Sequence, residues 1–247
     1  MAAPVPWKAR DKLPVRVVGI ETALPVGGIA LADGGKVAVH CPVPAERCSE
    51  SLLAELAGAL ESAGWGPESL DGVAVSIGPG SFTGLRVGMA AAKSLAWARG
   101  IPIAGVGTME ALAFAAPSSA QLICTLVPAR PGEVYAALFR RESTLEMVHP
   151  PRPVAPGQVA ELLPAGEGEV WLVGDGAEAC RPHLPRDPGL QSIRVCPLRE
   201  AGAAAGVALL GSRRLARGEA DDPASLAPVY LKKSEAEIRW QNRPGKN

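Results

Sequence analysis

The chain has few of the side chains that build most metal and redox centres. Only three of its 247 residues are histidines, and aromatic residues make up 4%. The histidines lie far apart and form no HxxxH or HExxH pattern, so a histidine-based metal centre is not expected. The five cysteines contain no CxxC pair. This favours buried thiols in a reducing compartment over disulfides or a metal site.

The sequence also lacks net charge and long apolar runs. Lysine plus arginine number 25, as do aspartate plus glutamate, so the formal net charge is +0. Such a chain has no overall field with which to hold a polyanion unaided. No apolar run reaches the roughly 18 residues that a membrane span needs, and residues 1–14 lack the apolar core of a signal peptide. We therefore expect a cytoplasmic protein without membrane contact.

Strand-like and helix-like segments alternate in the first half of the chain. An Ala-Asp-Gly-Gly turn at 32–35 joins two short β-rich runs, which predicts a hairpin. Apolar spacing and glycine stops predict the other elements. The expected strands lie at 15–20, 27–32, 36–41, 71–77 and 101–105, and the expected helices at 49–63, 84–99 and 108–115. This order predicts an α/β fold with mixed sheets and helical crossovers.

A change of composition near residues 117–120 separates the second half. We predict an N-terminal lobe at 15–117, a C-terminal lobe at 118–232, and flexible ends at 1–14 and 233–247. The expected second-half elements are strands at 122–127, 134–140, 170–173 and 228–231, a helix at about 201–217, and an exposed turn-rich stretch at 150–156. From Lys232 onward the chain is basic, which is typical of a frayed end and only sometimes of a contact arm.

The segment from Ile77 to Arg86, IGPGSFTGLR, is the most constrained in the chain. Unpaired N–H groups at a helix N-terminus attract anions, so one interpretation is a nucleotide or anion loop. The alternative is a tight strand-to-helix turn, capped by one of its hydroxyl side chains. The spacing excludes a Walker P-loop. Candidate residues for the anion interpretation are Thr22, Gly78, Gly80, Ser81, Thr83, Arg86 and Arg130.

The helix behind this loop carries a stripe of small residues. Gly84, Gly88, Ala92 and Ala96 recur every four residues, and a stripe almost without side chains lets another backbone approach closely. The stripe either packs on the chain's own sheet or is exposed to a second subunit, and the pattern alone leaves both interpretations open. Apolar bulk flanks it at Leu85, Met89 and Leu95.

These residues resemble the TsaB family of bacterial tRNA threonylcarbamoyladenosine biosynthesis subunits. The resemblance rests on GPGSFTGLRVGMAAAKSLAW, on IETA at 20–23 before it, and on PARPGEVYAALF at 128–139 and APVYLK at 227–232 after it. It implies a two-lobed actin-like fold, related to sugar kinases and the Hsp70 ATPase. It also implies a non-catalytic dimerisation subunit that supports the TsaD transferase.

The resemblance further implies the partners and the interface. A small ATPase, TsaE, joins the TsaD-bound pair, the chain forms a homodimer when alone, and tRNA is bound only through the complex. The acceptor is the adenosine 3′ of the anticodon in tRNAs that read ANN codons. No cofactor or metal is expected, although ATP or ADP between the lobes or at the subunit interface stays open. The expected interface residues are Gly84, Leu85, Gly88, Met89, Ala92, Leu95 and Ala96, with Leu53 and Leu56 from the preceding helix.

Two positions depart from the family pattern. Glu21 stands where the family has aspartate, and Pro128 replaces the aspartate before Ala-Arg. In actin-fold ATPases, carboxylates near these turns hold Mg²⁺-nucleotide or position water. Their change predicts weak or absent ATPase activity. The alternative function, an independent actin-fold small-molecule kinase or ATPase, would use the loop and Arg130 around phosphate.

Overall fold

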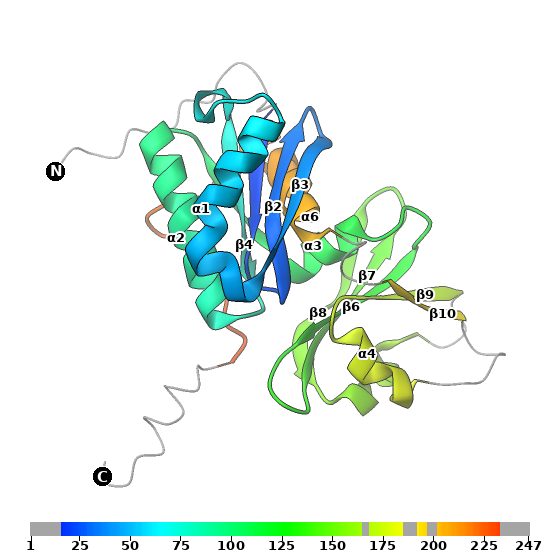
Figure 1. The fold of residues 1–247 in the computed structure, drawn as a ribbon. Helices are drawn as coiled ribbons and strands as arrows, with labels where there is room; N and C mark the ends of the chain where they lie inside the picture. Colours follow the sequence, from blue (N-terminus) through cyan, green and yellow to red (C-terminus); the bar gives the residue numbers. More distant parts are fainter. Residues whose placement is uncertain (1–15, 165–167, 185–191, 197–201, 233–247) are drawn as a thin grey trace, which may run out of the picture.

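The chain folds into two lobes, each built on a five-stranded mixed sheet (Figure 1). The computed structural model describes residues 16–164, 168–184, 192–196 and 202–232. No helix within these ranges is long and apolar enough to span a membrane. The ends expected to be flexible, 1–14 and 233–247, lie outside the described residues.

The two sheets share one topology. In each, the first three strands form an antiparallel meander, and two further strands add in parallel beside the first. The first sheet contains β1 (Arg16–Glu21), β2 (Val26–Asp33), β3 (Lys36–Pro44), β4 (Gly72–Gly78) and β5 (Ile103–Gly107). The second contains β6 (Leu122–Pro128), β7 (Val134–Arg141), β8 (Leu145–Val154), β9 (Glu169–Val173) and β10 (Ser192–Cys196). The predicted β2–β3 hairpin is confirmed.

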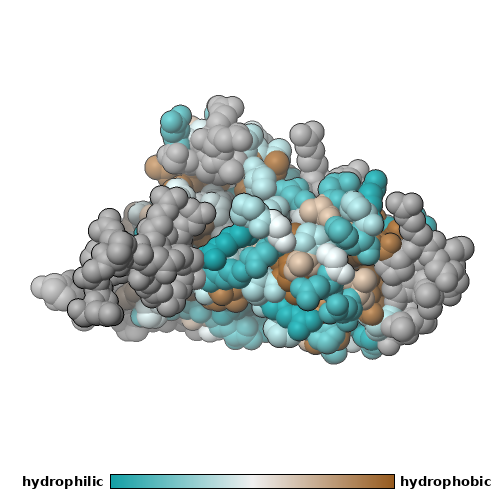
Figure 2. Space-filling view, turned by 90° about the horizontal axis from the view of Figure 1, so that it is seen from below, coloured by the Kyte–Doolittle hydropathy of each residue, from teal (hydrophilic) through white to brown (hydrophobic). Residues whose placement is uncertain are grey.

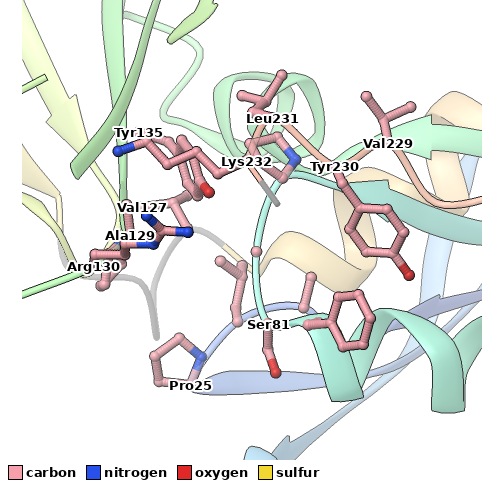
Figure 3. A pocket seen from close by; sticks show the side chains of 16 residues that line it. Pro25, Ser81, Val127, Ala129, Arg130, Tyr135, Val229, Tyr230, Leu231 and Lys232 are labelled. Atoms are coloured by element: carbon pink, nitrogen blue, oxygen red, sulfur yellow. The ribbon is translucent and has the colours of Figure 1, made fainter. Parts of the chain in front are cut away.

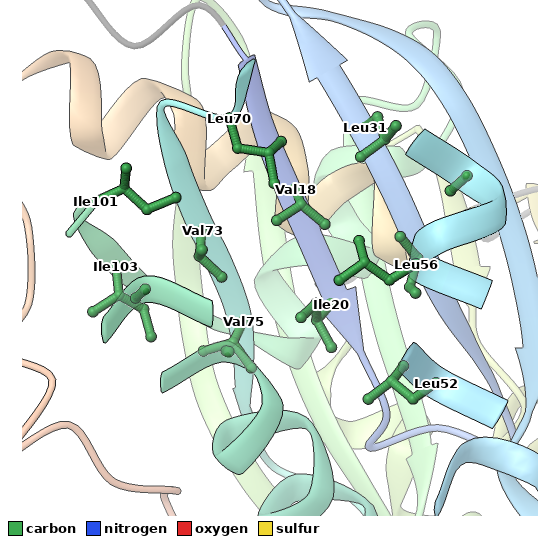
Figure 4. Close-up of a cluster of buried hydrophobic side chains, with 14 of the residues drawn as sticks. Val18, Ile20, Leu31, Leu52, Leu56, Leu70, Val73, Val75, Ile101 and Ile103 are labelled. Atoms are coloured by element: carbon green, nitrogen blue, oxygen red, sulfur yellow. The ribbon is translucent and has the colours of Figure 1, made fainter. Parts of the chain in front are cut away.

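Helices cover both faces of the first sheet because its strands are apolar on both sides. Val18 and Ile20 of β1 pack under α1 (Ala45–Ser62) and α2 (Phe82–Arg99) (Figure 4). Val17, one residue out of phase, packs under α6 (Ala203–Ala216) on the opposite face. Figure 1 shows α1 and α2 side by side on the side of the first lobe that faces away from the second.

Helix α3 (Thr108–Ala115) joins the lobes. Met109 and Leu112 pack on the second sheet, in a cluster with Ile123 and Phe139. The guanidinium of Arg141 donates to four carbonyl oxygens at and beyond the end of this helix, those of Ala113, Phe114, Ala116 and Pro117. Short helices cover the other face of the second sheet: α4 (Ala177–Cys180) and the 3-10 turns η2 (Pro156–Leu162) and η3 (Arg181–His183), while η1 (Pro67–Ser69) precedes β4.

The expected C-terminal lobe, 118–232, is wrong in its last part. Helix α6 returns to the first lobe, where Gly19 of β1 lies directly against Ala208 and Gly211 against Ala74. The chain then follows the edge of β5, where Asp221 N–H donates to Ile103 O at 2.8 Å. These contacts join residues that are far apart in the sequence and have small side chains, so hydrophobic periodicity does not reveal them.

Three smaller expectations also fail. Helix α1 begins at Ala45 rather than at residue 49. Residues 150–154 belong to strand β8 rather than to a turn, and only Pro150 and Arg152 among them are exposed, while the other three are half-buried. Residues 228–231 form no strand; a single backbone bond, from Val229 N–H to Ile77 O at 2.7 Å, holds them to the end of β4.

Candidate functional site

The glycine-rich loop after β4 is a packed strand-to-helix turn. Ser81 is the N-cap of α2, and its hydroxyl accepts from Gly84 N–H at 3.2 Å. Ser81 N–H donates to Ala23 O at 2.8 Å. A Cβ on Gly80 would overlap Ala23, and one on Gly84 would overlap Thr22. The loop therefore uses its glycines and part of its polar backbone to dock on the β1–β2 turn, which supports the turn interpretation of this motif.

The small-residue stripe on α2 faces the protein's own interior. Gly88, Ala92 and Ala96 are buried, and a Cβ on Gly88 would overlap the Thr22 hydroxyl, which donates to Gly84 O at 2.7 Å. The expectation that this stripe is an exposed interface is wrong, because α2 packs closely on β1 and β4 through this stripe and so buries it. The same burial removes Leu56, Leu85 and Met89 from the interface; Leu53 alone of the expected set is exposed, and Leu95 is half-buried.

The opposite side of the same two helices is exposed and carries mostly small side chains, with exposed charges at Glu50 and Glu61 of α1 and Arg86 of α2. On α2 it consists of Ala90, Ser94, Trp97 and Ala98, and on α1 of Leu53, Ala54, Ala57 and Gly58. Trp97 is 76% exposed and Leu53 is 68% exposed, the two largest values among the exposed large hydrophobic side chains of the described residues. We call these eight residues the α1/α2 face. Sequence reasoning missed it, although Ala90, Ser94 and Ala98 also recur every four residues.

A cleft of about 530 Å³ lies between the lobes. The first lobe contributes the β1–β2 turn and the loop that ends at Ser81, and the second contributes the end of β6, Arg130 and Tyr135 (Figure 3). The C-terminal segment 229–232 forms a third wall. Of the residues expected to bind an anion, Gly80, Ser81 and Arg130 line this cleft, while Thr22 is buried beneath it.

An aromatic cluster stands at the rim of the cleft. The rings of Phe82 and Tyr230 lie 4.8 Å apart between centroids. The guanidinium of Arg86 stacks over Phe82 at 3.9 Å, and its Nε donates to the Tyr230 hydroxyl at 3.2 Å. The first turn of α2 is thus joined to the C-terminal segment, a contact across 144 positions that the sequence pattern did not indicate.

Residues 221–232, which end in the C-terminal segment, are held at both ends. At the β5 edge, the carboxylate of Asp221 accepts from Gly105 N–H at 2.7 Å and pairs with Arg214 at 3.4 Å. At the cleft, the ammonium of Lys232 pairs with Glu133 in the β6–β7 turn of the second lobe. These contacts connect residues 221–232 to both lobes.

Glu21 does not reach the cleft. Its side chain is fully buried, and Oε1 accepts from Ala23 N–H at 2.5 Å, so the carboxyl folds back on its own turn. Oε2 finds no hydrogen-bond partner among the described residues. Burial raises the pKa of this carboxyl to about 7, against the lowering effect of the Ala23 N–H. The described residues contain no group of three or more His, Cys, Asp or Glu side chains that could hold a metal. These positions do not fit a magnesium–nucleotide complex.

The buried carboxyl of Glu21 predicts a specific pH dependence of folding. Its pKa is raised in the folded state from 4.5 to about 7, so folding takes up a proton between about pH 4.5 and 7, and stability falls as pH rises through that range. The loss for this group is about 3 kcal/mol at most. We expect Glu21→Gln to remove this dependence. Urea unfolding of both proteins at pH 5 and pH 8 measures it, and equal pH slopes would refute the assignment.

The chain is similar to known proteins over nearly its whole length. A family model described as TsaD, tRNA N6-adenosine threonylcarbamoyltransferase, matches residues 39–240. TsaB of Bacillus subtilis is 28% identical over 226 residues, which cover 91% of this chain and 97% of the relative. TsaB of Escherichia coli is 29% identical over 241 residues, which cover 94% and 100%. The chain belongs to the TsaB family.

A solved structure agrees with the observed fold. YeaZ from Pseudomonas aeruginosa superposes with a TM-score of 0.71, covering 87% of this chain and 99% of that one, at 23% identity. The predicted two-lobed actin-like α/β fold is thereby confirmed. The resemblance of the sequence to the TsaB family is confirmed as well. The fold places the TsaB-family loop against the β1–β2 turn, and leaves the α1/α2 face outside.

Proposed function

We propose that the chain is a non-catalytic subunit of tRNA threonylcarbamoyladenosine synthesis that binds and supports a TsaD-type transferase. The biosynthetic role is supported by the names of the two TsaB relatives. The observation that carries the proposed mode of action is the α1/α2 face, where Trp97 is 76% exposed on a helical surface of mostly small side chains. Exposed tryptophan surrounded by small residues is typical of an interface anchor.

The shape of this face favours a helical partner. The exposed side chains of Ala90, Ser94 and Ala98 on α2 and of Ala54 and Gly58 on α1 are small, so the helices of a partner can approach closely there. The lower face of the molecule differs, since it is largely hydrophilic with only separate hydrophobic patches (Figure 2).

The match of this chain to the transferase model supports a partner of the same family. A chain related to this one along residues 39–240 carries a matching α1–loop–α2 region, so its own helical pair can pack on this one with approximate two-fold symmetry. A second copy of this chain takes the same face when the transferase is absent. A TsaE-like ATPase joins the assembled pair, and tRNA is bound through the complex.

The geometry around Glu21 supports a non-catalytic role and disfavours the kinase or ATPase alternative. Phosphoryl transfer needs a cation and an oriented nucleophile beside the phosphate. The Glu21 carboxyl is buried in its own turn, and Pro128, which lines the cleft where the family has aspartate, offers no side-chain oxygen. Turnover of ATP by the isolated chain that is lost in Glu21→Gln would favour the alternative.

Reconstitution tests the proposed function. The chain, a TsaD-type transferase and a TsaE-like ATPase from one organism are combined with tRNA and a threonylcarbamoyl donor, and the modified nucleoside is measured by mass spectrometry. We expect modification only when the chain and the transferase are both present, and none from the chain alone. Full modification without the chain, or modification by the chain alone, would refute the proposal.

A further inference from the structure

We infer that the interlobe cleft is a contact site for single-stranded RNA, which takes up an unpaired nucleotide of the tRNA. The inference rests on the proposed function for the identity of the RNA. It goes beyond that function, because it gives this chain a direct contact with the substrate of the complex.

The first argument is the concentration of aromatic rings. The whole chain contains two tyrosines and three phenylalanines. Both tyrosines, Tyr135 and Tyr230, line this one cleft, and Phe82 lines it with them. Tyr230 is 41% exposed although it packs on Phe82. Aromatic faces that stay accessible in a cleft are stacking surfaces for unpaired bases.

The second argument is the charge of the lining. The described residues that line the cleft include Arg130 and Lys232 and no carboxylate. Arg86 adds a guanidinium at the rim, where it already stacks on an aromatic ring. Glu133 pairs with Lys232 from outside the lining. Cations beside stacking surfaces match the alternation of phosphate and base along a single strand.

The third argument is the size of the cleft. The volume of about 530 Å³ lies within the usual range for sites that enclose a small molecule, so one nucleotide fits.

RNA accounts for these features better than a protein partner does. The exposed apolar side chains of the α1/α2 face, which suit a protein partner, lie on the other side of the first lobe. A magnesium–polyphosphate ligand needs carboxylate oxygens, which this lining does not offer. A phosphodiester strand needs only cations and ring faces.

Binding of a labelled anticodon stem-loop RNA tests the inference. The probe is the unmodified stem-loop of a tRNA that reads ANN codons, titrated by fluorescence anisotropy into the complex of the full chain with its transferase. We expect the double variant Tyr135→Leu/Tyr230→Leu to weaken RNA binding between about fivefold and a hundredfold. We expect Arg130→Gln to weaken it about fivefold and to reduce the salt dependence by about one charge.

Matched controls carry the same chemistry outside the cleft. Phe114→Leu removes a ring that also stacks with an arginine, Arg213, at 4.5 Å. Arg217→Gln removes an exposed charge just beyond α6. The last turn of α6 packs near the start of β4, and the glycine-rich loop follows the opposite end of that strand. Neither is expected to change RNA affinity. The melting temperature of every variant is measured first, and a double variant that fails to fold is replaced by the single variant Tyr135→Leu, which is also expected to weaken RNA binding. Tyr230→Phe keeps the ring and is expected to bind RNA normally.

The possible results separate the inference from the proposed function. Weaker RNA binding by the cleft variants, with assembly and melting temperature unchanged, supports the inference. Cleft variants that bind the RNA with unchanged affinity overturn the inference. It is also overturned if these variants lose only their binding to the transferase, or only their affinity for free AMP, and still bind the RNA normally. If chain and transferase fail to assemble, the proposed function fails, and the same titration on the isolated chain still decides whether the cleft binds RNA.

Discussion

Trp97→Arg is expected to abolish assembly of the chain with its transferase while leaving the fold intact. The indole is 76% exposed, so the free chain loses little packing when it is replaced. In the assembly it would leave an anchor pocket empty and place an unpaired charge in a dry interface, a loss of about 2–4 kcal/mol or more. Co-purification of tagged chain with the transferase, followed by native mass measurement, reads out the result.

An exposed apolar residue in the second lobe provides the matched control. Met147 on β8 is 51% exposed, and Met147→Arg makes the same kind of change away from the α1/α2 face. We expect it to assemble normally, while Leu53→Arg on α1 behaves like Trp97→Arg. Recovery of the heteromer at wild-type yield with both Trp97→Arg and Leu53→Arg would place the interface elsewhere.

The second large effect is expected on folding, from the small stripe on the inner side of α2. Gly88 faces the Thr22 side chain, and a Cβ added there overlaps its hydroxyl. Moving that hydroxyl away would break its hydrogen bond to Gly84 O. We expect Gly88→Ala to destabilise the protomer by about 3 kcal/mol, and Gly88→Arg to prevent folding before any effect on assembly is seen.

Gly58 on α1 is the matched control for this change. It also lies within a helix, but a Cβ added there meets nothing within 4 Å. Gly58→Ala is therefore expected to stabilise the protein by about 0.5–1 kcal/mol through helix propensity. Urea unfolding of the two variants measures the difference. Equal stability of Gly88→Ala and Gly58→Ala would show that the inner stripe is not packed as described.

Local patterns predicted much of the fold. The Asp-Gly-Gly turn at 33–35 joins β2 to β3 and predicts their pairing, and α3 coincides with its predicted range because an apolar run follows a threonine. Strand β8 was missed because its three prolines are typical of a loop. Its edge position in the sheet tolerates them, since one side of an edge strand needs no ladder hydrogen bonds.

The sequence pattern placed the candidate interface on helix α2, but on the side of this helix that is buried. Helix α2 has small residues at 84, 88, 92 and 96 and again at 90, 94 and 98, so helical periodicity cannot distinguish the packed side from the exposed one. Leu85 and Met89 resolve the ambiguity in the structure, because their bulk is buried beside the inner stripe. Trp97 is the one large residue left outside.

The cleft could not be predicted, because its walls come from distant segments. Tyr135 and Tyr230 are 95 positions apart, and no short-range pattern links them. The orientation of the Glu21 carboxyl also depends on residues that are distant in the sequence. The loop and α2 pack on Thr22 and Ala23, and this packing determines the shape of the turn to which the carboxyl bonds.

Oxidative footprinting of Trp97 tests the central claim most directly. Hydroxyl-radical oxidation of the Trp97 peptide is measured by mass spectrometry in the free chain and in the heteromer with the transferase, with exposed Met147 as the internal reference. If the α1/α2 face is the docking surface, Trp97 oxidises at least about fivefold more slowly in the heteromer while Met147 is unchanged. Equal oxidation of Trp97 in the two samples would contradict the account.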